Sequence, residues 1–279
     1  MENNLMEKEP NHKKVPVGLD MYFNHSVAEK FAELEQNEKN FRVAKIVDDV
    51  IMSEIKDMKN PIFSAELGGG AHPDRYDKLF AQLLSEPRGH MDWVDVAPYM
   101  LKLAKKYIDN EKYKERLNVI KFVEDGILEY LEKLPVEKLD LAIMKYTVDH
   151  IADLDRLFAL MSQKLKTGGK LVASLGVLDP RLKSISTNAR FLYNGQEFSE
   201  DEVKILKDGD SFTVKFFNVS GDPKSGYLEG AETIKYYHSE DKMRELAKKY
   251  NLDISVGDWK EMLETTGIDQ LILVLRKIV

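Results

Sequence analysis

An acidic residue, Glu66, stands two positions before three consecutive glycines, 68–70, in a pattern that can bind a polar ligand. The apolar segment 62–67 predicts a strand that carries Glu66 at its end, and Pro73 can begin a helix just after the glycine turn 68–70. Glycine has no side chain, so a ligand can approach its backbone closely. A helix N-terminus favours polar or negative groups, and open α/β sheets bind ligands at the carboxyl ends of their strands. A plain glycine-rich turn without a ligand is the alternative.

The dinucleotide-binding motif G-x-G-x-x-G is a competing interpretation of the same glycines. That motif needs a small residue at its last conserved position, where the helix packs closely on the strand. Pro73 stands at this position. The departure weakens the case for a nicotinamide-dependent enzyme.

Strand-like and helix-like segments alternate regularly from residue 62 to residue 175. This order implies right-handed crossovers and a doubly wound, mostly parallel α/β sheet with helices on both faces. The strands are short and apolar, as burial on both faces requires. We predict strands at 62–67, 91–95, 118–123, 139–144 and 170–175, and helices at 73–84, 98–108, 127–133 and 153–165.

The segments on either side of this alternation have other patterns. Residues 1–60 hold a charged tail and one or two amphipathic helices at 26–58, which we expect to form an N-terminal helical cap. Residues 176–238 are rich in Gly, Asp, Ser and Asn and contain the alternating segment 211–217, which predicts an α/β insertion with a β-hairpin or small sheet. A helix at 239–250 and strands at 252–256 and 270–275 follow, so we expect 61–175 and 239–279 to form one domain.

Polar residues follow several of the predicted strands, where they would project from one edge of the sheet. An ionised carboxylate only accepts hydrogen bonds, so Asp95 after the second strand can hold both hydroxyls of a ribose. Asp125 after the third strand can accept a hydrogen bond from an adenine amine. Together with Glu66 and the glycine turn, these positions predict a site for an adenosine-containing ligand.

In this order and spacing, the segments resemble the motifs of the class I S-adenosylmethionine-dependent methyltransferases, over residues 60–175 and again over 239–279. Residues 65–70 look like the family's first motif, although His72 replaces its usual third glycine. The segments 94–101, 122–126, 139–143 and 165–171 resemble the motifs that follow, with Thr167 in place of a common proline. The resemblance implies a Rossmann-like, seven-stranded sheet whose last strand, 270–276, is antiparallel to the rest.

The resemblance also implies a cofactor, S-adenosylmethionine, whose product is S-adenosylhomocysteine. Asp95 would bind its ribose, Val96 would pack on the adenine, and Met144 would lie near the sulfonium. Lys145 would contact the cofactor carboxylate or the substrate, or else reach solvent. The cofactor-binding residues implied are Glu66, Gly68, Gly69, Gly70, Asp95, Val96, Met100, Asp125, Gly126, Met144 and Lys145.

A sulfonium methyl group is already activated, so an enzyme has to hold a nucleophile in line with it and remove a proton where needed. No metal is required, and the histidines show no metal-ligand spacing. His150 lies just past the fourth strand and is the first candidate for the general base, because an unperturbed histidine titrates near neutral pH. A purely structural histidine is the alternative. Tyr146 is a second candidate for a role in catalysis.

Four residues outside these motifs are candidates for binding the acceptor. Tyr22 lies in a segment that closes over the cofactor in similar enzymes, or else it supports the first helix as a hydrophobic staple. Arg190 would bind an anionic group or lie in solvent, and Tyr237 and His238 would line a pocket or pack under the insertion. In small-molecule methyltransferases an insertion after the fifth strand forms a lid over the acceptor or the contact of a homodimer. By this analogy we expect a small-molecule acceptor with an oxygen or nitrogen nucleophile.

Composition limits the remaining possibilities. The net charge is −7, from 41 basic and 48 acidic residues, which argues against broad nucleic-acid binding. The absence of cysteine excludes disulfides, thiolate catalysis and cysteine-ligated metals. We see no apolar run of about 20 residues and no signal peptide, and we expect a cytoplasmic protein without a membrane partner. A non-catalytic protein that binds S-adenosylmethionine or S-adenosylhomocysteine, or a methyltransferase acting on RNA or protein, are the alternatives.

Overall fold

The computed structural model describes residues 17–36, 38–176, 189–198, 206–219, 221–257 and 270–278. Its centre is a seven-stranded sheet in the order β10-β11-β5-β4-β1-β2-β3. The strands are β1 (Phe63–Leu67), β2 (His90–Asp95), β3 (Ile120–Glu124), β4 (Leu139–Lys145), β5 (Leu165–Gly176), β10 (Leu252–Val256) and β11 (Gln270–Lys277).

Strand β11 is antiparallel to both of its neighbours, β5 and β10, whereas the pairs among β1 to β5 are parallel. The predicted Rossmann-like sheet with an antiparallel last strand is therefore confirmed. The strand order reverses at the β1–β4 boundary, and in such sheets ligands bind at the carboxyl ends of the strands next to this point.

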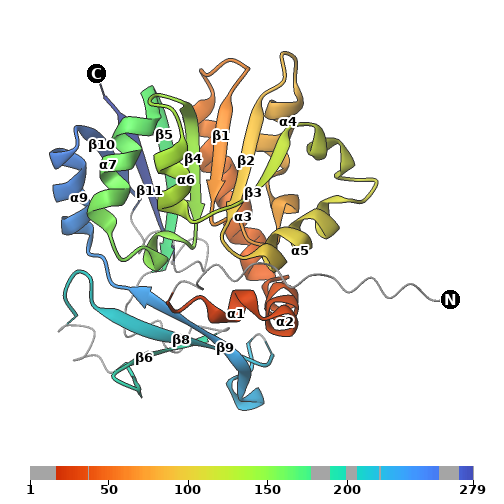
Figure 1. Cartoon of the computed structure of the whole chain (residues 1–279), viewed down its shortest axis with the longest axis vertical. Helices are drawn as coiled ribbons and strands as arrows, with labels where there is room; N and C mark the ends of the chain where they lie inside the picture. Colours follow the sequence, from red (N-terminus) through yellow and green to blue (C-terminus); the bar gives the residue numbers. More distant parts are fainter. Residues whose placement is uncertain are drawn as a thin grey trace.

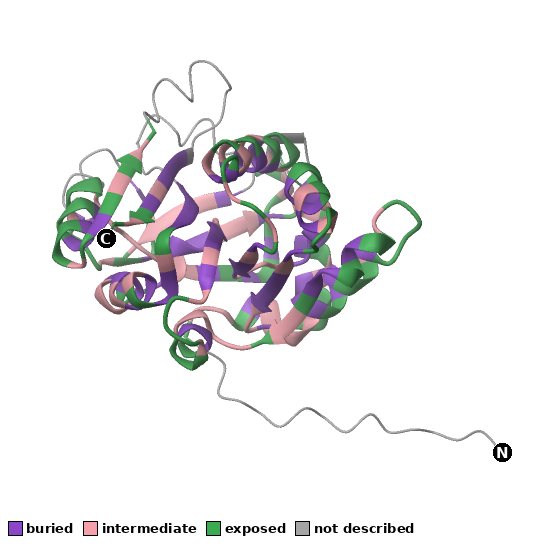
Figure 2. Cartoon of the chain, turned by 90° about the horizontal axis from the view of Figure 1, so that it is seen from above, coloured by how far each residue is buried: buried purple, intermediate pink, exposed green. Residues whose placement is uncertain are grey.

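Helices cover both faces of the sheet, as Figures 1 and 2 show. One face packs against α3 (Glu38–Ile55), α4 (Asp77–Leu84) and α5 (Pro98–Ile108). The other packs against α6 (Ile127–Lys133), α7 (Leu154–Lys164) and α9 (Glu240–Lys249). Side chains alternate along each strand, so Ile143 of β4 faces the first layer and Met144 faces the second.

The helix predicted at 73–84 has a different start. Residues Pro73–Arg75 form a 3₁₀ turn, η1, and α4 begins only at Asp77. The carboxylate of Asp48, on α3, accepts hydrogen bonds from the amides of Lys78 and Leu79, at 2.8 and 3.0 Å. The first amides of α4 are thus bound by the protein itself, so this helix N-terminus does not offer them to a ligand as the sequence suggested.

The cap consists of α1 (Asp20–Phe23) and α2 (His25–Glu35), at the carboxyl end of the parallel strands (Figure 1). Asn24 caps α2, because its side chain accepts from the amides of Ser26 and Val27. Apolar residues of the cap, including Phe31, pack between α5 and strand β9. Helix α3, which the predicted boundary at residue 60 included in the cap, instead packs in the core beside α4.

The insertion forms a second, four-stranded antiparallel sheet in the order β7-β6-β8-β9. Its strands are β6 (Ala189–Tyr193), β7 (Gln196–Glu197), β8 (Ser211–Phe217) and β9 (Tyr227–Tyr236), and a 3₁₀ turn, η5 (Pro223–Ser225), lies between β8 and β9. A further 3₁₀ turn, η3 (Val148–His150), follows β4 in the core. The alternating segment 211–217 is β8, as predicted. Residues 258–269, between β10 and β11 in the sequence, lie outside the described residues. Within the described ranges, none of the helices is both long and apolar enough to cross a membrane.

The cap is tied directly to the outer edge of the insertion sheet. The carbonyl oxygen of Gly18 accepts from the amide of Ile234 at 3.1 Å and from the hydroxyl of Thr233 at 2.7 Å. Gly18 has φ +80°, and a Cβ there would lie 2.5 Å from Cβ of Ile234, so only glycine fits this contact.

Candidate functional site

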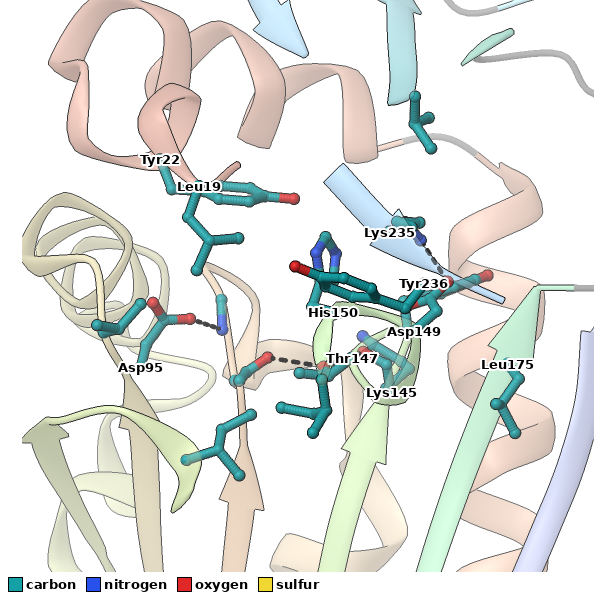
Figure 3. Close-up of a pocket in the computed structure, with 18 of the residues that line it drawn as sticks. Leu19, Tyr22, Asp95, Lys145, Thr147, Asp149, His150, Leu175, Lys235 and Tyr236 are labelled. Carbon is teal, nitrogen blue, oxygen red and sulfur yellow. Dashed lines mark hydrogen bonds and ion pairs between the residues drawn. The ribbon is translucent and has the colours of Figure 1, made fainter. Parts of the chain in front are cut away.

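A cavity of about 680 Å³ lies where the core, the cap and the insertion meet. It opens over the carboxyl ends of β1, β2 and β4, and this size falls within the roughly 300–1,000 Å³ typical of ligand pockets. The glycine turn and Asp95 line one end, which we call the core end. Side chains of β6, β8 and β9 line the other, which we call the insertion end; Figure 3 shows residues from both.

The glycine turn at the core end has a conformation that requires glycine. Gly68 and Gly70 have φ of +77° and +61°, and the amides of Gly68 and Gly69 donate to the carbonyl of Val94 at 2.8 and 2.9 Å. A Cβ on Gly68 would lie 2.3 Å from Cγ2 of Thr147, and one on Gly69 would lie 2.4 Å from the Trp93 ring. The turn therefore presents bare backbone to the cavity.

Asp95 stands at the end of β2 and holds the glycine turn in place. Its Oδ2 accepts from the amide of Gly70 at 2.9 Å, and its Oδ1 accepts from the amide of Ala97 at 2.8 Å. A carboxylate has about four lone-pair positions, so each oxygen can accept one more hydrogen bond. Burial raises the pKa of Asp95 to about 6, and the two backbone hydrogen bonds oppose that rise.

Glu66 lies behind the turn and does not itself line the cavity. Its Oε1 accepts from the hydroxyl of Tyr76 at 3.2 Å, whereas its Oε2 is buried and has no hydrogen-bond partner among the described residues. Burial raises the pKa of Glu66, and the positive charge of Lys145 opposes the rise. Burial and the charge of Arg75 lower the pKa of Lys145, whose ammonium lies 5.5 Å from the centre of the Tyr76 ring.

Most of the predicted cofactor residues line the cavity, but three do not. Glu66 is behind the turn, and Met144 is in the hydrophobic core because strand alternation turns it away while Lys145 faces the site. The carboxylate of Asp125 bonds to the ammonium of Lys133 and to the amide of Gly126, and it does not reach the cavity wall. The predicted residues that do line it are Gly68, Gly69, Gly70, Asp95, Val96, Met100, Gly126 and Lys145.

His72, which replaces the third glycine of the motif, joins the turn to the cap. Its Nε2 donates to the carbonyl of Ala32 at 3.0 Å, and Arg75 donates to the carbonyl of Glu35 at 2.7 Å. Both carbonyls lie in the last turn of α2, where carbonyl groups lack partners within the helix. The cap is thus fixed at its C-terminal end to residues that directly follow the glycine turn.

The junction between the two ends is formed by the loop after β4. Tyr146 begins this loop with φ +60°, which is unusual for a residue other than glycine, and its amide donates to Ser174. His150 follows on η3, and the centre of its ring lies 6.3 Å from that of Tyr22 (Figure 3). Burial lowers the pKa of His150 to about 4, and the positive charge of Lys235 acts in the same direction. The imidazole is therefore neutral at physiological pH.

An ion pair that the sequence did not reveal connects η3 to the insertion. The ammonium of Lys235, on β9, lies 2.6 Å from Oδ2 of Asp149. The other oxygen, Oδ1, is buried and has no hydrogen-bond partner among the described residues. Nε2 of His238 donates to the carbonyl of Ile151 at 2.8 Å and holds the end of β9 to the same loop.

Three of the four predicted acceptor residues, Tyr22, Tyr237 and His238, line the cavity, whereas Arg190 does not. Its neighbours on β6 point into the cavity, so alternation turns Arg190 to the other face, over the Phe217 ring. Several residues that line the cavity were not predicted from the sequence. They are Thr147, Asp149, Lys235, Phe191, Phe212, Val214 and Phe216. Only the alternation in 211–217 signalled any of them.

Residues 76–173 match a family model described as a methyltransferase domain. No curated protein is similar enough in sequence to match the chain.

Solved structures share the fold at low sequence identity. One is an S-adenosylmethionine-dependent methyltransferase from Clostridium acetobutylicum, at 17% identity and a TM-score of 0.54, with 90% of this chain and 99% of that one covered. Another is phosphoethanolamine N-methyltransferase 2 from Haemonchus contortus in complex with S-adenosyl-L-methionine, at 16% identity and a TM-score of 0.55, with coverage of 94% and 59%. A third is an O-methyltransferase family protein from Burkholderia thailandensis, at 12% identity and a TM-score of 0.54, with coverage of 93% and 62%.

Proposed function

We propose that this chain, which belongs to the class I S-adenosylmethionine-dependent methyltransferase family, methylates an oxygen or nitrogen atom of a small molecule bound at the insertion end of the cavity. The observation that carries the proposal is the continuity of the cavity. A glycine turn with an adjacent buried carboxylate lines one end, and a neutral histidine stands at the junction with the other.

The residues at the core end fit the cofactor of the family, S-adenosylmethionine. The turn presents backbone to the cavity, and a Cβ on Gly70 would meet only Cε of Met100, at 3.7 Å, so there is open space beside Gly70. Asp95 keeps lone pairs for the ribose hydroxyls. Glu66 lies behind the turn and outside the cavity wall, so we give it no direct contact with the cofactor. When bound, the cofactor supplies a methyl group that its sulfonium already activates.

His150 is the residue that we propose takes the proton from the acceptor. The hydroxyl of Thr233 gives its one proton to Gly18, so Oγ1 of Thr233 can only accept from Nδ1 of His150, which lies 3.5 Å away. We infer from this contact that the imidazole proton is on Nδ1, which leaves Nε2 as the basic atom. A general base typically contributes about 10²–10⁴ to the rate when its pKa lies near the operating pH, and the lowered pKa of His150 puts its contribution towards the lower end of that range.

A small acceptor is supported by the way in which the cavity is enclosed. The cap and the insertion sheet approach one another over the core and are hydrogen-bonded at Gly18. A nucleic-acid or protein acceptor would need an open and, for nucleic acid, a basic surface next to the junction. The cavity wall carries six carboxylates and only three Lys or Arg side chains among the described residues, which favours a small molecule.

The test is calorimetric titration of the protein with S-adenosylmethionine and S-adenosylhomocysteine, followed by transfer of a tritiated methyl group to a panel of small alcohols, phenols and amines. We expect micromolar binding of both cofactor forms and turnover with at least one acceptor. Binding without turnover on small molecules, RNA or protein would favour a non-catalytic binding protein. Absence of binding to folded protein would overturn the proposal.

A further inference from the structure

The insertion end of the cavity has an apolar wall on one side. Phe191, Phe212, Val214 and Phe216 alternate along β6 and β8 and line it. Phe191 pairs directly with Val214, and the Phe191 and Phe212 rings meet edge to face with centroids 5.9 Å apart. A surface of this kind suits a flat, apolar body such as a ring system.

The charged side chains of the cavity as a whole are mainly carboxylates, although several stand at the core end, where Glu35 lies near Asp95 and Glu129 lies beside Gly126. Of the three Lys or Arg side chains on the described cavity wall, two are at the core end and one is paired. Arg75 and Lys145 lie at the core end near Glu66, and Lys235 is paired with Asp149. Within the described residues, an anionic acceptor would therefore be buried at the insertion end without a free counter-charge, which is costly.

Asp149 is the polar group that this end leaves unsatisfied. Its side chain is 10% exposed and the residue lines the cavity, yet only Oδ2 is paired, with Lys235. Oδ1 is buried and accepts no hydrogen bond within the described part of the chain. A buried carboxylate oxygen without a donor destabilises the protein, so a ligand that brings an O–H or N–H group is favoured.

We propose that Asp149 accepts a hydrogen bond from a hydroxyl or amine group of the acceptor. We also propose that the acceptor is an uncharged or cationic molecule with an apolar, ring-sized body. This inference rests on the proposed function and names the class of its second substrate. A site that hydrogen-bonds a polar group rejects analogues without that group much more strongly than an apolar pocket rejects a change of size. Asp149 therefore sets specificity, while the β6–β8 wall provides affinity.

The test measures binding to the protein saturated with S-adenosylhomocysteine, using probes that share one ring and differ only in the polar group. The probes are naphthylethanol, naphthylethylamine and naphthylacetate, and calorimetry measures the binding of each. We expect the alcohol and the amine to bind at least about ten-fold more tightly than the acetate. Equal or tighter binding of the acetate, or no binding of any probe, would overturn the inference.

Two variants assign the effect to Asp149. Asp149→Asn should weaken the amine by about ten-fold or more and the alcohol by less, because the charge is lost and the shape is kept. Lys235→Met should make the amine bind more tightly, because it frees the second carboxylate oxygen of Asp149. If Asp149→Asn does not fold, this variant tests whether Asp149 sets the specificity. Asp153→Asn is the matched control. It removes another carboxylate from the cavity wall, and Asn caps the following helix as well as Asp does.

Affinity for S-adenosylhomocysteine, measured on the same samples, distinguishes a failure of cofactor binding from a failure of the specificity assigned to Asp149. If wild-type protein does not bind it, the proposed function itself fails. If it binds and the acetate is preferred, or Asp149→Asn leaves all three probes unchanged, only the specificity of Asp149 fails.

Discussion

The core end of the cavity is made of backbone, whereas the insertion end is made of side chains from segments far apart in the sequence. At the core end, Gly68 and Gly70 adopt positive φ, and Asp95 fixes the turn by accepting a hydrogen bond from the amide of Gly70, 25 residues away. At the insertion end, Asp149 meets Lys235 across 86 residues. The first end depends on local conformation and therefore tolerates little change, while the second can be altered one side chain at a time.

The junction between the ends should show the largest effect on the reaction. His150→Gln should lower turnover by about 100-fold or more with any acceptor, because the neutral base is lost. Affinity for S-adenosylhomocysteine should stay within about three-fold, since the core end is untouched. Turnover is followed by methyl transfer and affinity by calorimetry. His90→Gln, at the opposite end of the sheet, is the control, and an equal loss of turnover in both variants would contradict a role for His150.

The glycine turn should be the most sensitive point for cofactor binding. Gly68→Ala adds a Cβ 2.3 Å from Thr147 and strains a φ of +77°, so we expect about 10- to 100-fold weaker binding of S-adenosylmethionine. Gly168 has nearly the same φ, +78°, with open space around it, so Gly168→Ala imposes the strain without the clash. Calorimetry should show unchanged affinity in that control. If both variants bind equally well, the turn does not shape the site.

Variants of Asp95 and Asp125 test whether both carboxylates bind the cofactor, as the sequence motifs imply, or only Asp95, which alone of the two lines the cavity. Removing an ionised hydrogen-bond acceptor costs about 1.5–3 kcal/mol, so Asp95→Ala should weaken cofactor binding by about 10- to 100-fold, with partial recovery in Asp95→Asn. Asp125→Ala should change affinity by less than about three-fold, because that carboxylate bonds to Lys133 and Gly126 outside the cavity. A strong loss in Asp125→Ala would restore the role that the sequence predicted for it.

The pH dependence of cofactor binding should be smaller and should follow Asp95. Burial raises its pKa to about 6, so the carboxyl group is ionised at pH 7 and becomes protonated as the pH falls. Affinity for S-adenosylmethionine should therefore fall by up to about ten-fold between pH 7 and pH 5. Asp95→Asn should remove most of the dependence, and an affinity that rises on acidification would contradict it.

The sequence predicted the core end well because its determinants are local. A glycine turn after a strand and an acidic residue after the next strand are short patterns, and periodicity placed α5 and α6 at their observed bounds. It failed where neighbouring residues of a strand point to opposite faces. Lys145 and Phe191 line the cavity, whereas the adjacent Met144 and Arg190, which the sequence predicted to do so, do not. It could not find the Asp149–Lys235 pair, because that contact depends on how the insertion folds back onto η3.

The bond between Gly18 and β9 bears on when the cavity forms. Gly18 and Thr233 are 215 residues apart, and contacts of such separation form slowly because a long loop must close first. While the chain is being synthesised, α2 can already pack on α5, but the strand that receives Gly18 does not yet exist. We therefore expect the core end to form first, and the contact between Gly18 and β9 to form only after β9 has been synthesised and has paired.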